Sequence, residues 1–309
     1  MTKYILRRIL FMIPVMLGVS LIVFTLMYIT PGDPAAIILD EGATPEAIEM
    51  LREEMGLNDG YFVRFGRFLL DVVVHQDLGV CYQTHQPVAE RIAETFPNTM
   101  MLAGASVLVA VVIGLIMGII SAVKQYSFFD TAAMFLAMVG NAMPNFWQGL
   151  LLMLLFALHL KWLPASGFGS LKHLILPAVT IGTSSAAAIA RMTRSSMLEV
   201  IRQDYIVSAR AKGQSEFWIT VRHALANAMI PVITTIGMQF GSLLGGAVLT
   251  ESIFAVPGIG KMMVDAIKAR NYPVVQGGVL IIALTFSLIN LLVDILYAYI
   301  DPRIRSQYR

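Results

Sequence analysis

The sequence predicts an all-α membrane protein with six transmembrane helices and with both termini in the cytoplasm. Three features lead to this prediction: an apolar composition, six long stretches without charged residues, and an uneven distribution of lysine and arginine. Of the 309 residues, 57% are hydrophobic and 14% are charged, whereas about a quarter of the residues of a soluble domain are charged. The chain therefore has too few charged groups to cover a soluble surface.

The six stretches approach or exceed the roughly 20 apolar residues that a helix needs to cross a bilayer core of about 30 Å. The first follows three basic residues and is longer than the apolar part of a signal peptide, so we expect an uncleaved span. The fourth is short and rich in threonine and serine, and it is the weakest candidate for a span. The six stretches run from Ile9 to Gly32, Thr95 to Val123, Thr131 to Leu160, His173 to Ala190, His223 to Thr250 and Asn271 to Val293.

Lysine and arginine set the orientation, because both residues are enriched in cytoplasmic loops. The long segment after the first span is left out, since long loops cross the membrane largely regardless of charge. The two short outer loops then hold five basic residues: Lys161, Lys172, Lys261, Lys268 and Arg270. The inner segments hold thirteen: Lys3, Arg7, Arg8, Lys124, Arg191, Arg194, Arg202, Arg210, Lys212, Arg222, Arg303, Arg305 and Arg309.

Three regions follow from this topology. Residues 1–30 form the first transmembrane helix with its cytoplasmic N-terminus, residues 31–94 form an extracytoplasmic helical insertion, and residues 95–309 form a five-helix core. The core carries a cytoplasmic loop at 191–225.

The insertion contains recognisable helix signals. Thr44 suits an N-cap, Pro45 the first helical position, and Gly56 the end of the same helix. The aromatic-rich segment from Tyr61 to Val74 suits an amphipathic helix against the membrane body, and Pro87 could open a third helix. Two interpretations are equally weighted: a docking surface for an external solute-carrying protein, or a lid that only stabilises the outer ends of the spans.

Polar residues inside the spans mark a possible solute route. Asn141, Asn145 and Gln148 share one face of a continuous helix, with Pro144 as the expected kink, and Gln239 lies in the fifth span. They could line an aqueous pathway, or they could hydrogen-bond neighbouring helices at about 0.6 kcal/mol each. The second interpretation is slightly favoured.

The fifth span also carries a glycine stripe of Gly237, Gly241 and Gly245, and the second span carries Gly114 and Gly118. Glycines at this spacing allow two helix backbones to approach closely. Packing within the chain is one explanation. The other is that the stripe on the fifth span forms a seam with a second subunit or a wall of the pathway.

The longest inner segment joins the fourth and fifth spans. Its periodicity predicts one helix from Leu198 to Lys212, ended by Gly213, and a second short helix from Phe217 to Leu225. Two helices around a glycine on the inner face suit a lever that transmits force from a soluble partner. An ordinary basic cytoplasmic loop is the alternative.

The sequence as a whole closely resembles the inner-membrane permeases of binding-protein-dependent ABC importers, in the dipeptide, oligopeptide, nickel and glutathione class. The resemblance covers essentially the whole chain, and its strength lies in many motifs in the same order. They are Tyr4-Ile5-Leu6-Arg7-Arg8, Pro31-Gly32-Asp33-Pro34, Met143-Pro144-Asn145-Phe146-Trp147, Trp162-Leu163-Pro164, Ile175-Leu176-Pro177-Ala178, Asp204-Tyr205, Ala209-Arg210-Ala211-Lys212-Gly213, Arg222-His223-Ala224-Leu225, Asn227-Ala228-Met229-Ile230-Pro231, Glu251-Ser252-Ile253-Phe254, Pro257-Gly258-Ile259-Gly260, Tyr272-Pro273-Val274-Val275-Gln276-Gly277 and Asp301-Pro302-Arg303-Ile304-Arg305.

The resemblance implies the fold of a type I ABC importer permease, with a coupling helix that docks on the ATPase subunit. The general signature of such permeases is EAA, three residues, glycine, nine residues, then I-x-L-P. Aligned on the glycine, only Ala209, Gly213 and Leu225 match it here. The residues implied for coupling are Tyr205, Ala209, Arg210, Ala211, Lys212, Gly213 and Leu225.

The resemblance also implies the partners: a related second permease in a heterodimer, two ATPase subunits that bind ATP and magnesium, and an extracytoplasmic solute-binding protein. The complex would lie in the bacterial plasma membrane, which is the inner membrane where there are two. The chain has no GxxxxGK[ST] motif, so its energy source is expected in another subunit. We expect it to have no catalytic residue, cofactor or metal of its own.

Other functions fit less well. A secondary transporter or channel usually shows intramembrane charges or inverted repeats, and an intramembrane enzyme would need a motif such as HExxH or GxSxG, which the sequence lacks. A net charge of +2 without a basic stripe argues against nucleic acid, and the single Cys81 excludes an internal disulfide framework. Peptides are favoured as solute over nickel chelates, and glutathione remains an alternative.

Overall fold

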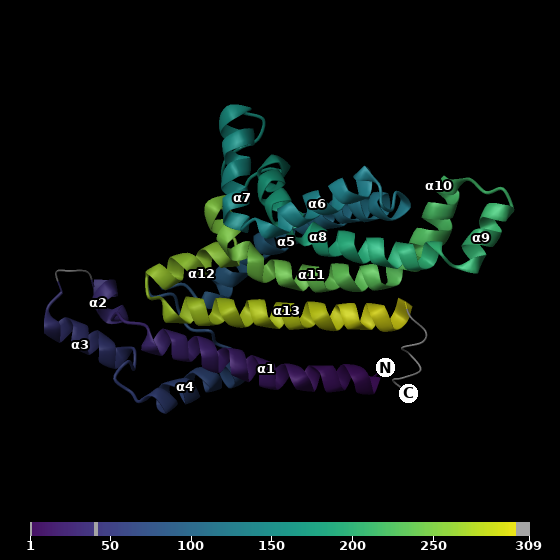
Figure 1. Cartoon of the computed structure of the whole chain (residues 1–309). Helices are drawn as coiled ribbons and strands as arrows, with labels where there is room; N and C mark the ends of the chain where they lie inside the picture. The colour runs from purple at the N-terminus through teal and green to yellow at the C-terminus, as the bar shows by residue number, and fades with distance from the viewer. Residues whose placement is uncertain (1, 40–42, 301–309) are drawn as a thin grey trace. The chain divides into compact units, whose positions relative to one another are not determined.

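The computed structural model describes residues 2–39 and 43–300, so the expected cytoplasmic arginines Arg303, Arg305 and Arg309 lie outside the described residues. Within these ranges every regular element is helical, apart from one isolated antiparallel bridge between Val80 and Pro87. Figure 1 shows the order of the helices along the chain. The prediction of an all-α protein is confirmed.

Within the described residues, five single helices are long and apolar enough to cross a membrane, and a bent pair of helices makes a sixth candidate if its two halves count as one span. These five or six candidates coincide with the six predicted spans, including the weak fourth one. The five are α1 (Thr2–Ile29), α5 (Val88–Val123), α8 (Leu171–Ile201), the continuous helix formed by α10 (Glu216–Trp218), η3 (Ile219–Leu225) and α11 (Ala226–Ile253), and α13 (Tyr272–Ile300).

The bent pair consists of α6 (Phe128–Ala142) and of α7 (Asn145–Leu152), which continues as η2 (Met153–His159); the angle between them is 105°. The break has a local cause, because the residue before a proline is disfavoured in the helical region. Met143 accordingly has an extended backbone with ψ 130°, and Pro144 is the N-cap of α7. The expectation that Asn141 shares a helix face with Asn145 and Gln148 was therefore wrong.

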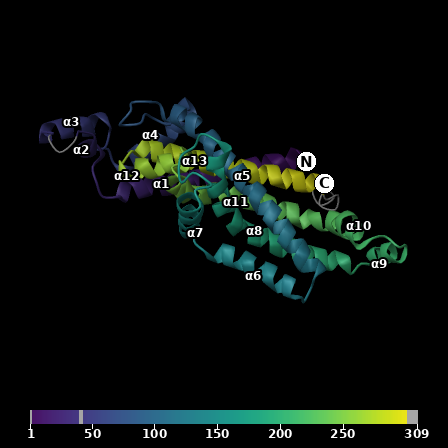
Figure 2. The same ribbon diagram turned by 90° about the horizontal axis from the view of Figure 1, so that it is seen from above.

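The described residues form two compact units: unit 1 contains residues 2–6, 100–256 and 286–300, and unit 2 contains residues 7–39, 43–99 and 257–285. In unit 1, α8 is the central helix and packs against α6 and α11 (Figure 2). Buried residues make up 67% of its apolar window. The core of unit 1 is therefore built around the span whose sequence is the least apolar.

The threonines and serines of α8 are compatible with this burial because their hydroxyls bond to the helix itself. Thr180 donates to the carbonyl of Leu176 at 2.8 Å, and Ser184 donates to the carbonyl of Ile181 at 2.8 Å. Such internal hydrogen bonds satisfy a polar group without a partner from another helix. A short span rich in Thr and Ser can thus lie in the interior of a helix bundle.

Glycines allow α5 to approach α8 closely. A methyl group at Gly114 would lie 2.7 Å from the side chain of Ile189, and one at Gly118 would lie 2.5 Å from the side chain of Thr193. Both distances are shorter than any normal carbon contact, so only glycine fits. The pair on the second span is therefore used for packing within the chain.

Unit 2 contains α2 (Pro34–Leu39), α3 (Pro45–Glu54), α4 (Tyr61–Leu70), η1 (Asp71–His75) and α12 (Ile259–Lys268). The predicted start and end of α3 are confirmed: the Thr44 hydroxyl accepts a hydrogen bond from the Ala47 amide at 3.3 Å, and Gly56 follows the helix with φ +64°. Pro87 opens no separate helix in the insertion, because α5 begins at Val88 directly after it.

The predicted amphipathic helix of the insertion is confirmed as α4, and it packs against α1. The ring of Phe24 on α1 lies 5.4 Å from Tyr61 and 5.2 Å from Phe65, and the Thr25 and Tyr61 hydroxyls are 2.7 Å apart. The aromatic face of α4 therefore fixes the insertion on the first span.

A second tie joins the insertion to the start of α13. The buried Cys81 thiol accepts hydrogen bonds from Arg91 Nη1 and Asn271 Nδ2, both at 3.0 Å. Burial raises the pKa of Cys81, but hydrogen bonds with Thr84 and Gln83 and the charge of Arg91 outweigh this effect and lower the pKa to about 7. The single cysteine thus has a structural role that connects two distant parts of the sequence.

Candidate coupling region and pathway

The coupling region is defined here as residues 202–218, which join the predicted cytoplasmic ends of α8 and α11. The structure corrects its expected helices. α8 runs on to Ile201, a turn follows, and α9 (Asp204–Ala211) is a separate helix (Figure 1). Gln203 adopts the extended N-cap conformation with ψ 149°, and Asp204 places an acid in the first turn of α9, which stabilises a helix N-terminus.

The second expected helix of the loop is also different. Residues Phe217 to Leu225 do not form an isolated short helix, since Glu216–Ile253 is one continuous helix in which Ser215 is the N-cap. The Ser215 hydroxyl accepts a hydrogen bond from the Trp218 amide at 3.4 Å. The coupling region is therefore held at both ends by long helices that cross the membrane.

One apolar cluster anchors α9 to these long helices. Ile206 is fully buried and packs with Met197 of α8 and with Ile219 of the following helix. Ala209 and Leu225, two of the predicted coupling residues, are partly buried against this same cluster. Their side chains face the interior of the chain, so their small size and shape serve internal packing.

The other predicted coupling residues lie at the surface. Tyr205 has 44% of its side chain exposed, and Arg210, Ala211, Lys212 and Gly213 are exposed as well. Sequence reasoning missed two exposed aromatic side chains of the region, Phe217 at 70% and Trp218 at 55%. Their signal was present, since two adjacent aromatic residues directly follow the expected turn.

An ion pair closes the turn between α9 and α10. Arg210 Nε and Nη2 donate to the two carboxylate oxygens of Glu216 at 2.6 and 3.1 Å. Hydrogen bonding to Glu216 raises the pKa of Arg210 above its usual value. Gly213 lies within this turn with φ +77°, a left-handed conformation that glycine adopts without strain. The ion pair therefore joins the two residues that flank the turn around Gly213.

A buried ion pair holds the inner end of α6 to α8. Asp130 is 6% exposed and accepts two hydrogen bonds from Arg194, from Nε and Nη2, each at 3.0 Å. The Ser121 hydroxyl and the Tyr126 backbone amide donate to the same carboxylate. Four donors thus satisfy the buried charge, as a buried ion pair requires.

The expected pathway residues are divided by the bend in the third span. Asn141 is exposed on α6, whereas Asn145 and Gln148 lie on α7, which packs against α8 and α11. Gln148 Nε2 donates to the Thr183 hydroxyl at 2.6 Å, and its Oε1 is buried without a hydrogen-bond partner among the described residues. Gln148 therefore contributes to helix packing, and Asn141 is the member of the set that lies exposed at the surface of the chain.

The glycine stripe on α11 is divided in a similar way. Gly237 lies against Val293 and Gly241 against Phe286 of α13, where an added methyl group would come within 2.4 and 3.1 Å of these side chains. Gly245 has no atom within 4 Å of such a group, and Gln239 is half-buried. Packing within the chain explains two of the three glycines, and Gly245 is left for a seam or a pathway wall.

The fold matches that of known ABC importer permeases. A solved structure of the MetNI methionine ABC transporter in inward-facing conformations aligns over 69% of this chain and 97% of its own, with TM-score 0.60 and 17% identity. A solved amino acid ABC transporter aligns over 70% of this chain and 94% of its own, with TM-score 0.51 and 15% identity. These similarities define the class of fold, an ABC importer permease.

The family is defined by sequence. The family described as binding-protein-dependent transport system inner membrane component matches residues 97–306, and the corresponding N-terminal family matches residues 1–103. The dipeptide transport system permease protein DppB of Alkalihalophilus pseudofirmus is 45% identical over 99% of this chain and 100% of its own. The glutathione transport system permease protein GsiC of Salmonella paratyphi A is 43% identical over 99% of both chains.

This chain belongs to the family of binding-protein-dependent transport system inner membrane components. It is a multi-pass inner-membrane permease of an ABC importer, a transport subunit without catalytic activity of its own, and it works with ATPase and solute-binding-protein partners.

Proposed function

We propose that this permease forms half of a translocation pathway for dipeptides, oligopeptides or similar small solutes such as glutathione. The observation that carries the proposal is similarity over the full length of permeases named for dipeptide and glutathione transport, at 45% and 43% identity. The second half of the pathway would come from a related permease, in a heterodimer. A nickel-chelate importer of the same architecture is the alternative.

We further infer that the coupling region is where an ATPase subunit docks. Its exposed side chains include aromatic, cationic and small residues, and α9 is anchored to two spanning helices through Ile206. Aromatic residues that remain exposed in a monomer and lie near charged groups are typical of protein interfaces. A short helix fixed in this way can transmit a displacement to α8 and α11 without folding or unfolding.

The cycle would use two ATPase subunits, which bind ATP and magnesium. A loaded solute-binding protein docks outside, ATP closes the ATPases, and the coupling regions of the two permeases move with them. The pathway then opens to the outside and receives the solute, and hydrolysis returns it to the inward-facing state.

The solute is tested on the solute-binding protein encoded with this permease, because in such systems that protein selects the cargo. Calorimetry should measure its affinity for dipeptides, longer peptides, glutathione and nickel chelates. We expect a peptide or glutathione to bind at least about tenfold more tightly than any nickel chelate, a difference of about 1.4 kcal/mol. The opposite order would replace the proposal by metal-chelate import.

A further inference from the structure

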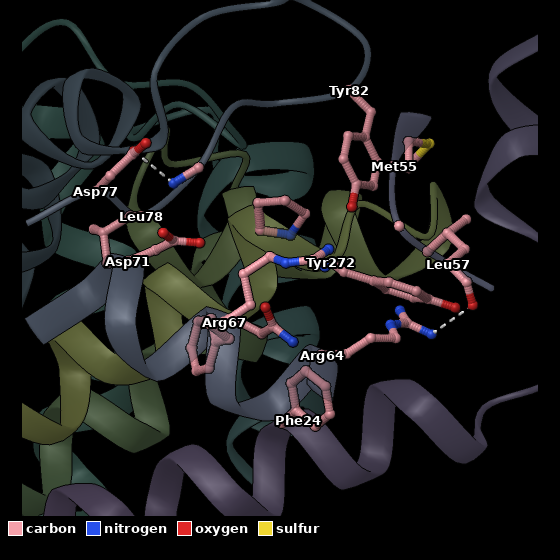
Figure 3. A pocket seen from close by; sticks show the side chains of 15 residues that line it. Phe24, Met55, Leu57, Arg64, Arg67, Asp71, Asp77, Leu78, Tyr82 and Tyr272 are labelled. Atoms are coloured by element: carbon pink, nitrogen blue, oxygen red, sulfur yellow. Dashed lines mark hydrogen bonds between the residues drawn. The ribbon is translucent and has the colours of Figure 1, made fainter. Parts of the chain in front are cut away.

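A pocket of about 180 Å³ lies within unit 2, between the extracytoplasmic insertion and the first turns of α13 (Figure 3). Phe24 and Phe68 supply part of its apolar wall, and Arg64, Tyr82 and Tyr272 contribute polar groups. Figure 3 shows the Tyr82 hydroxyl directed toward the space beside Tyr272, with the Arg64 guanidinium close to the Tyr272 ring. Polar groups from three separate segments therefore converge on one small space.

Two of the lining side chains belong to largely buried residues but keep accessible polar groups. Gln276 is 7% exposed and Tyr272 is 8% exposed, and within the described residues neither the amide nor the hydroxyl forms a hydrogen bond. Neither group is among the buried polar atoms that lack a partner, so both are open to the pocket. They are therefore available to a ligand that enters it.

Arg64 is the third lining residue whose side chain has N–H or O–H groups left to donate. In the described part of the chain it forms no ion pair, and its contacts are a long hydrogen bond of 3.4 Å to the Leu57 carbonyl and a position 5.4 Å from the Tyr28 ring. Its neighbour Arg67, by contrast, is held by Asp59 at 2.7 Å. A guanidinium with free N–H groups beside tyrosine hydroxyls and an amide favours a carboxylate.

Acidic residues line the same pocket. Asp71 Oδ1 contacts His75 Nδ1 at 3.1 Å, and Asp77 Oδ1 accepts a hydrogen bond from the Gly79 amide at 2.8 Å. These contacts use one oxygen of each carboxylate, so the second oxygen can accept a hydrogen bond from a ligand. The pocket therefore combines a site for a carboxylate with acceptors for an ammonium group.

We propose that this pocket binds a small zwitterion, either a free amino acid or a dipeptide, with its carboxylate at Arg64 and its ammonium group toward Asp71 and Asp77. The volume limits the ligand, because about 180 Å³ is below the roughly 300–1,000 Å³ of pockets for drug-sized molecules. A long oligopeptide does not fit inside it. This inference deepens the proposed function, since the ligand has the chemistry of the proposed cargo, but the site rests on its own contacts.

The test uses the complete importer complex in lipid nanodiscs, without its solute-binding protein. Binding of radiolabelled L-alanyl-L-alanine is measured with the unmodified complex and with Arg64→Gln, Tyr272→Phe and Lys268→Gln. Lys268 is exposed on α12 and does not line the pocket, so its variant is a control for loss of one outer positive charge. A blocked analogue, acetylated at the amino group and amidated at the carboxyl group, tests the zwitterion requirement.

We expect saturable binding that is weakened about tenfold or more by Arg64→Gln, weakened less by Tyr272→Phe and unchanged by Lys268→Gln, because a charge-assisted hydrogen bond contributes more than a neutral one. The blocked analogue should not compete. If Arg64→Gln fails to assemble, Tyr272→Phe decides, since it removes only a hydroxyl.

The absence of saturable binding, or equal binding by Arg64→Gln, overturns the proposal. Peptide selection by the solute-binding protein is measured separately, so a negative result here leaves the proposed cargo intact.

Discussion

Among single residues, Gly213 imposes the sharpest local constraint on the coupling region. Its φ of +77° is left-handed, yet no atom lies within 4 Å of the position that a Cβ would occupy. A substitution there therefore costs backbone energy, about 1–2 kcal/mol, but causes no clash inside the chain. The position separates an effect on docking from an effect on folding.

We predict that Gly213→Arg leaves the complex assembled but lowers substrate-stimulated ATP hydrolysis and uptake. The added side chain would stand on the surface that we assign to the ATPase. Gly169→Arg is a control for the added side chain alone, because Gly169 also has an open environment but has no left-handed φ and lies on the predicted outer side. Both activities are measured in proteoliposomes, and unchanged uptake by Gly213→Arg would reject the role of this turn in coupling.

The ion pair between Asp130 and Arg194 leads to a prediction about stability. Removing one partner of a buried ion pair leaves the other uncompensated, so we expect Asp130→Asn to destabilise the permease by about 3–5 kcal/mol. Asp265→Asn, which breaks an exposed pair with Lys261 at 3.1 Å, should cost no more than about 1 kcal/mol. Thermal unfolding in nanodiscs compares them. Equal midpoints for the two variants would show that the buried pair contributes nothing beyond a surface pair.

At the scale of elements, the spans and several helix ends were predictable from the sequence because they depend on local signals. Apolar length located every span, and Thr44, Pro45 and Gly56 marked the ends of α3. These features need no knowledge of distant residues. The same holds for α4, whose aromatic content marked it as a helix that packs on the membrane body.

Other elements depended on a competition that periodicity alone does not resolve. The backbone preference at Met143, before a proline, outweighs an apolar pattern that would suit one straight span. The turn at Gln203 divides a segment whose periodicity suits one helix. The inward orientation of Ala209 and Leu225 follows from the cluster around Ile206, which forms only when α8 and the following helix meet.

The helix start that carries Phe217 and Trp218 leads to a third prediction. If these rings contact the ATPase, replacing both by alanine should weaken ATPase association by about 30-fold, since truncating a buried aromatic anchor typically costs 2 kcal/mol or more. Trp162→Ala is the control, because Trp162 is 67% exposed on the predicted outer side. Association is measured by surface-captured nanodiscs. Normal association would instead place the two rings in the lipid interface.

At the scale of the whole molecule, the chain combines spanning helices with a short turn that we predict on the cytoplasmic side and an insertion that we predict on the outer side. Its sequence contains no phosphate-binding glycine-rich motif of the GxxxxGK[ST] kind. Two families of binding-protein-dependent membrane components together match residues 1–306. The energy for transport must therefore reach the helices through contacts with another subunit.

The pocket in unit 2 could not be predicted from the sequence. Arg64, Tyr82 and Gln276 are far apart along the chain and carry no common motif. They meet because the insertion packs against the start of α13, through contacts such as those of Cys81 with Asn271. A site assembled by tertiary packing of this kind becomes visible only in the folded chain.

The central claim is that this permease moves solute only when ATPase subunits drive it. The most direct test is uptake of a radiolabelled dipeptide by proteoliposomes that contain the permease pair and the loaded solute-binding protein, with and without the ATPases. We predict uptake only when the ATPases and hydrolysable ATP are both present. Uptake of equal rate without the ATPases, driven by an ion gradient alone, would contradict the account.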